Sequence, residues 1–423
     1  MAGTGIDTSM LHKGAHSASY FDLARAAGEG VEIVDFCIPC NPYFPTPEMF
    51  DELSRELKNI LKYYPSDSAS ITKKLASVLG LHPQTVAMAN GSTELITWID
   101  HLLIKESVAV PIPTFGRWTD QPLETGKRVD MFPLQERDGF RLNLDDYVRF
   151  IRERGSRVAV VCNVNNPDGC YLPRREVIRF MDMLSDLDLV VVDESFIDFS
   201  DAEQYPSVGP DAVIRPNAVV LKSLGKNFGL HGIRFGYMLG NPAIAGKIAK
   251  VLPKWNLNSL AEKVVFMIQE HEDEYEDSLR LLSRDRRQMA AELSRVPGLT
   301  VFPSQGNFFL VKLPTEWSGT GLRDFLVGNH GIMTRECGNK LGMTSQFMRL
   351  VVRPARDVDR LIDGMMDYAR QFMGGRSSQQ QYDEDQMDPR AGRWSSQMDD
   401  VPNNLIQYPS RRTEYTARRA ANG

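Results

Sequence analysis

Seven short aliphatic segments constrain the fold of this 423-residue chain more than any other feature of its sequence. They lie at residues 86–89, 107–112, 128–134, 158–164, 189–193, 219–224 and 235–239. Val, Leu and Ile fill them with few interruptions, which indicates strands that are covered on both faces, as in a parallel sheet. Stretches with helical spacing separate most of them. The pattern predicts one α/β domain with a mostly parallel, seven-stranded sheet over about residues 46–255.

The chain changes character after this domain. Residues 260–293 show a long amphipathic helical pattern, which we interpret as the connection into a smaller α+β domain. We therefore expect four parts: an N-terminal arm with the first part of the small domain (1–45), the large domain (46–255), the linking helix with the small C-terminal domain (256–373), and a tail (374–423). The tail is rich in Gln, Ser and Arg and poor in aliphatic residues, so we expect it to be disordered.

Bulk properties exclude several function classes. The net charge of -6 is mild and spread along the chain, which disfavours nucleic acid as a partner. No apolar run approaches the length of about 20 residues that spans a bilayer, and no apolar core of a signal peptide opens the chain, so we expect a cytoplasmic protein without a membrane partner. Cys37 and Cys40 form a C-x-x-C pair, but Asn41-Pro42 follows and cannot propagate a helix, and no second pair exists. We expect no metal or redox site there.

The turn after the strand at residues 219–224 concentrates polar chemistry. It carries the hydroxyl of Ser223, the amine of Lys226 and the guanidinium of Arg234. A hydroxyl and a guanidinium both donate hydrogen bonds to phosphate oxygens. Gly229 and Gly232 lie in the same turn, where glycine indicates positive φ or a close approach of another backbone. The alternative is an ordinary turn with solvated cations.

Two upstream residues extend this chemistry. Asp193 ends the strand at residues 189–193, and such strand ends are where open α/β sheets place ligands. Asn166 lies in the run Asn-Val-Asn-Asn-Pro-Asp-Gly at residues 163–169. A lysine for a Schiff base, an aspartate that keeps a pyridinium nitrogen protonated and an amide for a phenolic oxygen are what pyridoxal 5'-phosphate (PLP) requires. The sequence therefore predicts PLP as the cofactor, with Lys226 as its attachment point and Asp193 as its second catalytic residue.

A second anion site is expected where the strand at residues 86–89 turns on glycine into a helix. Ser92 or Thr93 as the N-cap would leave free backbone N–H groups, which bind anions. Ordinary helix capping is the alternative. Beside Ser223 and Arg234, these residues would complete a site for the cofactor phosphate.

The motifs together resemble those of the fold-type I PLP-dependent enzymes, in the class I/II aminotransferase family. The resembled branch contains histidinol-phosphate aminotransferases and threonine-phosphate decarboxylases, and the likeness covers about residues 10–370. The motifs are residues 163–169, Asp-Glu-Ser-Phe at 193–196, Ser-Leu-Gly-Lys at 223–226 with Arg234, and Pro-Thr-Phe at 113–115. The resemblance implies that Phe115 stacks on the pyridine ring. It also implies a homodimer in which Tyr64 reaches the cofactor phosphate of the neighbouring subunit.

Two arginines lie inside strand-like runs of the small domain. Arg335 and Arg349 would be costly to bury there unless they are paired. Structural salt bridges are one answer, and an anion of the substrate is the other. The resemblance identifies Arg349 with the family's carboxylate clamp and Arg335 with a second anion site. We also expect Asn41 and Asn307 to contact the substrate.

Two positions depart from the family pattern. Gly225 replaces the usual hydroxyl residue before the lysine, and Phe196 replaces the tyrosine that donates to the phenolic oxygen of the cofactor. We expect an aminotransferase that acts, through a Lys226 aldimine, on an L-amino acid or similar substrate with an anionic group, because that branch is broader. The alternative is a decarboxylase of a (phospho)amino acid, since Phe196 and the run at residues 335–339 resemble threonine-phosphate decarboxylases. A PLP-binding regulator without turnover is a third reading, which the retained residues disfavour.

Overall fold

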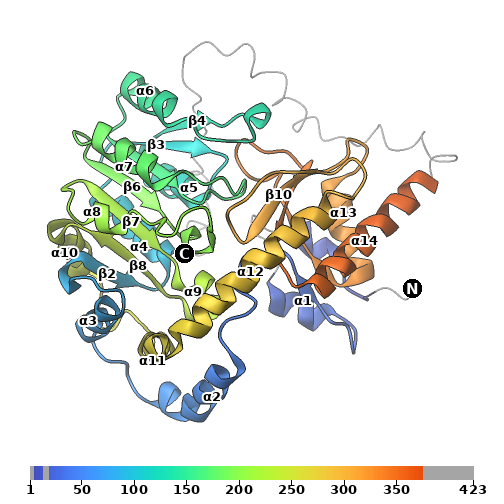
Figure 1. Ribbon diagram of the computed structural model, residues 1–423, viewed down its shortest axis with the longest axis horizontal. Helices are drawn as coiled ribbons and strands as arrows, with labels where there is room; N and C mark the ends of the chain where they lie inside the picture. Colours follow the sequence, from blue (N-terminus) through green and yellow to red (C-terminus); the bar gives the residue numbers. More distant parts are fainter. Residues whose placement is uncertain (1–3, 13–18, 375–423) are drawn as a thin grey trace, which may run out of the picture. The chain divides into compact units, whose positions relative to one another are not determined.

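Seven strands form the central sheet of the computed structural model, which describes residues 4–12 and 19–374 (Figure 1). Their order is β2-β8-β7-β6-β5-β3-β4. They are β2 (Val86–Ala89), β3 (Ser107–Ile112), β4 (Arg128–Pro133), β5 (Val158–Cys162), β6 (Leu189–Asp193), β7 (Ala218–Lys222) and β8 (Gly236–Gly240). The predicted seven-stranded α/β sheet is confirmed.

The sheet is parallel from β4 to β7, and β8 runs antiparallel to both of its neighbours. The chain between β7 and β8 holds only the short helices α9 (Leu224–Asn227) and η5 (His231–Ile233). The connection is too short to hold the covering helix of a parallel crossover, so β8 returns antiparallel beside β7. The sheet is therefore mostly parallel, as expected, with an antiparallel end.

Helices bury both faces of the sheet. Val190, Val192 and Val220 contribute to one hydrophobic cluster, whereas Val191 and Val219 contribute to another. Alternate residues of a strand point to opposite faces, so these two clusters are the two sides of one sheet. The covering helices include α3 (Ser68–Val78), α4 (Ser92–Leu102), α5 (Arg117–Glu124), α6 (Leu144–Arg154), α7 (Arg174–Met183), α8 (Gly209–Ala212) and α10 (Pro242–Val251). The buried valines explain why the strands could be recognised from their composition.

A second group of strands combines β1, from before the central sheet in the chain, with strands that follow it. A four-stranded antiparallel sheet has the order β12-β13-β10-β9, and β1 pairs in parallel with β11. The strands are β1 (Val34–Asp35), β9 (Thr300–Val301), β10 (Phe308–Lys312), β11 (Ile332–Met333), β12 (Arg335–Glu336) and β13 (Phe347–Val351). β1, β9, β11 and β12 are only two residues long. A third hydrophobic cluster joins these strands to the helices α12 (Glu272–Leu293), α13 (Gly319–Phe325) and α14 (Ala355–Gly374).

The long helix expected over residues 260–293 is interrupted, so that expectation is wrong. The structure has α11 (Ser259–Met267), a 3-10 turn (Ile268–His271) and then α12, which runs in a different direction (Figure 1). Val264 and Val265 of α11 pack against the seven-stranded sheet, whereas Leu282 and Met289 of α12 pack in the cluster of the smaller sheet. The chain bends because the two halves bury their apolar faces in different cores.

The described residues up to Ala369 cluster into one compact unit that contains both sheets. The boundaries at residues 46, 256 and 374 stay predictions. The expected disorder beyond residue 374 falls outside the described residues. Within the described part of the chain, no helix is both long enough and apolar enough to cross a membrane.

Candidate active site

The predicted catalytic residues lie at the carboxyl ends of three adjacent strands. β5, β6 and β7 are parallel neighbours, with Cys162 opposite Asp193 and Asp193 opposite Leu221. Asn166 follows β5, Asp193 ends β6, and Lys226 lies in α9, four residues after the end of β7. Asn166 and Lys226, sixty positions apart in the chain, therefore both follow the carboxyl ends of strands in one part of the sheet.

Asp193 is buried and both of its carboxylate oxygens are held. Oδ2 accepts a hydrogen bond from Trp118 Nε1 at 2.9 Å, and Oδ1 accepts one from Ser195 N at 3.0 Å. These two neutral donors fix the orientation of the carboxylate. The sequence analysis did not predict a role for Trp118. Its position three residues after Phe115 could have indicated one.

Lys226 has an amine between two aromatic rings. Its Nζ lies 4.1 Å from the centre of the Phe196 ring and 5.6 Å from that of Phe115. Burial lowers the pKa of Lys226 to about 8, against the opposing pull of the Asp193 carboxylate and with a smaller contribution from Arg349. An amine with such a pKa is partly unprotonated near pH 7. A nucleophile needs the unprotonated form, and a proton carrier needs both forms to be accessible.

The expected phosphate residues gather around the start of α4, with one correction. Neither Ser92 nor Thr93 is the N-cap, because Gly91 occupies that position with φ +79° and offers no side chain. Ser92 and Thr93 are instead the first two residues of the helix. A Cβ at Gly91 would lie only 2.7 Å from Arg234 Nη2, so the guanidinium lies against the backbone at the helix start. Such a helix start beside a guanidinium favours a phosphate.

The turn that carries Lys226 depends on one of its two glycines. Gly229 has φ +63°, and a Cβ there would lie 2.1 Å from Phe44 O and 2.5 Å from Asn41 O. The expectation for Gly232 is wrong, since it has no positive φ and no neighbour within 4 Å. Only Gly229 is required, because the segment around Asn41 packs directly on the lysine turn.

Ser223 and Gly225 form the other side of the expected phosphate site. Ser223 is the N-cap of α9, but its hydroxyl makes no capping hydrogen bond and is not consumed by the helix. A Cβ at Gly225 would lie 3.1 Å from Leu230 O. Position 225 lacks the hydroxyl side chain that is usual in the resembled family, and the backbone of Leu230 approaches it closely.

Arg349 and Arg335 come together on the smaller sheet. They are direct partners in the antiparallel pair of β12 and β13. Arg349 is buried and donates to Asn166 Oδ1 at 2.8 Å and to Cys37 O at 2.6 Å, while its Nε has no partner. Among the described residues, no carboxylate forms an ion pair with Arg349, so the alternative of a structural salt bridge does not hold for it.

Asn41 and Asn307 are both buried near the lysine turn. Asn41 Nδ2 donates to Ser278 Oγ at 2.8 Å, and its backbone N–H donates to Lys226 O at 3.2 Å. Asn307 Nδ2 donates to Cys40 O at 3.1 Å, while its Oδ1 is buried without a partner. Asn41 is thus occupied in holding the turn, and its contact with substrate stays a prediction, as does that of Asn307.

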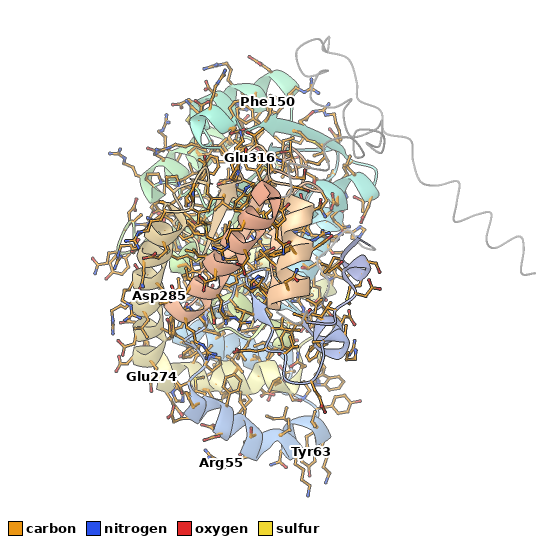
Figure 2. The ribbon with its side chains drawn as sticks, turned by 90° about the vertical axis from the view of Figure 1, so that its right-hand side faces the viewer. Arg55, Tyr63, Phe150, Glu274, Asp285 and Glu316 are labelled. Atoms are coloured by element: carbon orange, nitrogen blue, oxygen red, sulfur yellow. The ribbon has the colours of Figure 1, made fainter. Side chains whose placement is uncertain are left out.

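Tyr64 lies on the surface after α2 (Pro47–Lys62), where it is 85% exposed. Leu61, Tyr63 and Trp255 are exposed around it, and the Trp255 ring lies 5.5 Å from that of Tyr64. Figure 2 shows Tyr63 projecting outward beyond the end of α2. An exposed apolar patch of this kind is typical of an interface with another chain.

A buried ion pair behind the site was also missed. Lys222 Nζ lies 3.2 Å from Glu194 Oε2 and 3.0 Å from Asp198 Oδ1. Burial opposes the charge on Lys222, but the carboxylates of Asp198 and Glu194 outweigh it and raise the pKa of the amine. This ion pair ties the segment that carries Phe196 to the strand that leads to Lys226. A lysine inside an aliphatic strand was the available signal.

The arrangement fits PLP. It offers an amine for a Schiff base, a carboxylate fixed by two donors, and a helix start with a guanidinium for the phosphate. The buried Nε of Arg349 and Oδ1 of Asn307 lack partners, which indicates that a polar ligand completes this region. None of the described cysteines forms a disulfide.

Comparison with known proteins agrees with this geometry. The model of the family "Aminotransferase class I and II" matches residues 31–365. An L-serine phosphate decarboxylase of Campylobacter jejuni is 28% identical over 366 residues, which cover 84% of this chain and 93% of that protein. A histidinol-phosphate aminotransferase of Archaeoglobus fulgidus is 29% identical over 338 residues, which cover 79% and 93%. The structure of a decarboxylase from Sulfurospirillum multivorans superposes with a TM-score of 0.76 at 28% identity and covers 85% of this chain and 95% of that one.

These findings overturn the reaction that we favoured from the sequence. Aminotransfer was the main expectation, but the relatives above that match the larger share of this chain are decarboxylases. The alternative of decarboxylation is better supported. The breadth of the aminotransferase branch was the wrong criterion, because the Phe196 departure and the run at residues 335–339 already pointed to the decarboxylases.

Proposed function

This chain belongs to the class I and II aminotransferase family of PLP-dependent enzymes, and we propose that it decarboxylates an O-phosphorylated L-amino acid. The observation that carries the proposal is the pairing of Arg335 with Arg349 across β12 and β13. Two guanidinium groups on one face of a sheet suit a substrate with two anions, such as a carboxylate and a phosphate. The likeness to an L-serine phosphate decarboxylase makes O-phospho-L-serine the first substrate to test.

The residues at the sheet edge have separate roles. PLP, when bound, supplies an electron sink for the negative charge that develops at Cα. Asp193 would accept a hydrogen bond from the protonated ring nitrogen of the cofactor, and the donors Trp118 Nε1 and Ser195 N orient its carboxylate for this task. Asn166 Oδ1 accepts a hydrogen bond from Arg349. The NH₂ group of Asn166 would therefore be available to donate to the phenolic oxygen of the cofactor.

Orientation of the substrate decides which bond to Cα breaks. In the proposed reaction, Arg349 binds the carboxylate and Arg335 the second anion. The bond between Cα and the carboxylate breaks, carbon dioxide leaves, and the electron pair stays at Cα. Lys226 Nζ then gives a proton to Cα, for which a pKa near neutrality is suitable.

We also propose a homodimer, because the apolar patch around Tyr64 is exposed in a single chain and a second copy would bury it. In that assembly Tyr64 would donate to the cofactor phosphate of the partner. Ser92, Thr93, Ser223 and Arg234 would hold the same phosphate from within the chain.

The test is incubation of the purified, PLP-supplemented protein with O-phospho-L-serine, O-phospho-L-threonine, L-serine and L-glutamate, with and without 2-oxoglutarate. We expect carbon dioxide and the phosphorylated amine from a phosphoamino acid, independent of 2-oxoglutarate. Lys226→Ala serves as the control and should release none. Formation of a keto acid that requires 2-oxoglutarate, without carbon dioxide, would overturn the proposal.

A further inference from the structure

A loop of the smaller sheet extends over the carboxyl end of β3. It joins β12 to β13 and begins with a turn in which Lys340 N donates to Cys337 O at 2.9 Å. Gly342 has φ +80°, and a Cβ there would lie 3.3 Å from Pro113 N. The loop is therefore packed against the segment that carries Phe115.

Lys340 points its amine into this junction. Its Nζ donates to Thr114 O at 3.1 Å, so it lies one residue from the predicted stacking ring, Phe115. An ammonium has three donors, and no ion pair within the described part of the chain includes Lys340. The groups that act on it electrostatically include Arg349 and Arg335, which lower its pKa, and Cys337 and Cys162, which raise it. Burial and then Arg349 lower the pKa of Lys340 to about 8.

Three cations thus cluster where the substrate's anions are expected. Arg335 and Arg349 are paired on the sheet, and each acts electrostatically on Lys340. Arg349 is buried, and Arg335 and Lys340 are half-buried. Like charges held together in such a place are costly unless a ligand of the opposite sign compensates them. A phosphate ester carries about 1.5 to 2 negative charges at pH 7. With one carboxylate, a phosphoamino acid brings nearly three negative charges to three cations, whereas a dicarboxylic amino acid brings two.

We propose that Lys340 binds the phosphate of the substrate together with Arg335 and so selects phosphorylated over carboxylated substrates. This inference rests on the proposed function and adds a specificity-determining residue to it. The hydrogen bond from Lys340 to Thr114 O anchors the amine at a fixed place, and its other donors serve the phosphate.

The test measures binding to the PLP-loaded protein by titration calorimetry at pH 7.0, with two probes that cannot react because they lack an amino group. The probes are 3-phosphonooxypropanoate and glutarate, which match in chain length and differ in the phosphate. We expect Lys340→Met to weaken binding of the phosphate probe about 10- to 100-fold and that of glutarate less than threefold. Lys340→Arg should restore most of the affinity. Lys312→Met, which removes an amine paired with Glu136 outside the cluster, is the control and should change neither affinity.

The outcomes separate this inference from the proposed function. The role of Lys340 would be overturned if Lys340→Met weakened binding of both probes equally. It would also be overturned if the variant bound both probes like the parent while unfolding like the parent. Release of carbon dioxide from O-phospho-L-serine would in that case still support the decarboxylase. A parent protein that binds the phosphate probe through Lys340 but decarboxylates nothing would support the inference and contradict the function.

Discussion

Arg335 and Arg349 are directly opposed in the antiparallel pair of β12 and β13, so two like charges share one face of a small sheet. Opposed like charges destabilise a strand pair. Arg349 is held in this position by Asn166 and Cys37, and its guanidinium lies 5.4 Å from the centre of the Phe308 ring. The fold thus keeps two like charges opposed, which supports the proposal that an anionic substrate binds beside them.

Arg349→Lys should weaken substrate binding although it keeps the charge. Lysine cannot form the planar fork that contacts Asn166 and Cys37 at once and still reaches a carboxylate. We expect the KM for O-phospho-L-serine to rise about 10- to 100-fold. Arg356→Lys, at an exposed arginine that pairs with Glu32, is the matched control and should leave KM unchanged. An unchanged KM in Arg349→Lys would contradict the assigned role.

Gly229→Ala should destabilise the protein much more than Gly232→Ala. An alanine at residue 229 would adopt a left-handed φ of +63° and press its Cβ against the carbonyls of Phe44 and Asn41. We expect its free energy of unfolding to fall by about 2 kcal/mol or more, with a shift of the lysine turn. Gly232 has open space around it, so its alanine variant should stay within about 1 kcal/mol of the parent. Urea unfolding of the two variants measures this difference, and equal stabilities would refute the prediction.

The strands were predictable because burial on both faces leaves a composition signal. The seven aliphatic runs correspond to the seven strands within two residues at either end. The bend between α11 and α12 was not predictable from periodicity. Both halves are amphipathic, and only their different packing partners separate them. The N-cap at Gly91 was missed because a glycine cap leaves no side-chain signature.

The location of the proposed site was predictable where one short motif carries one candidate residue. Lys226, Asp193 and Asn166 were identified from short runs and do lie on adjacent strand ends. Trp118 and Lys340 were missed because their importance depends on contacts over 75 and 226 positions. Such contacts follow from the fold and not from local sequence.

Phe196→Tyr should change how the bound cofactor titrates. Phe196 is buried with its ring centre 4.1 Å from Lys226 Nζ. The family resemblance implies that a tyrosine at this position would donate to the phenolic oxygen of PLP. A hydrogen bond to a charged oxygen is worth about 1.5 kcal/mol or more, which is about one pKa unit. We expect the midpoint of the visible absorbance titration to fall by about one unit in the variant. An unchanged midpoint would show that the tyrosine hydroxyl does not reach the cofactor.

Attachment of PLP to the cofactor-free protein should depend on pH with a midpoint near 8. Burial lowers the pKa of Lys226 from 10.5 to about 8, so the neutral, nucleophilic amine forms as pH rises through 8. The rate of adduct formation, trapped by borohydride, should rise about tenfold per unit below pH 8 and level off above it. Asp193 raises this pKa, so Asp193→Asn should move the midpoint to lower pH. A midpoint near 10 would contradict the buried environment.

Mixing two inactive variants tests whether Tyr64 serves the partner subunit. Tyr64→Ala would lose a phosphate donor, and Lys226→Ala would lose the attachment point. In a mixed dimer, the site with an intact Lys226 receives Tyr64 from the Lys226→Ala chain and is complete, whereas the other site lacks both groups.

Random reassociation of equal amounts makes half of the dimers mixed, so about one quarter of the parental activity should return. Each variant alone should stay inactive or nearly so. Recovery of no activity, in a mixture shown by mass to contain mixed dimers, would mean that Tyr64 acts within its own chain. Its 85% exposure in a single chain argues against that outcome, because a tyrosine that served its own site would be enclosed by it.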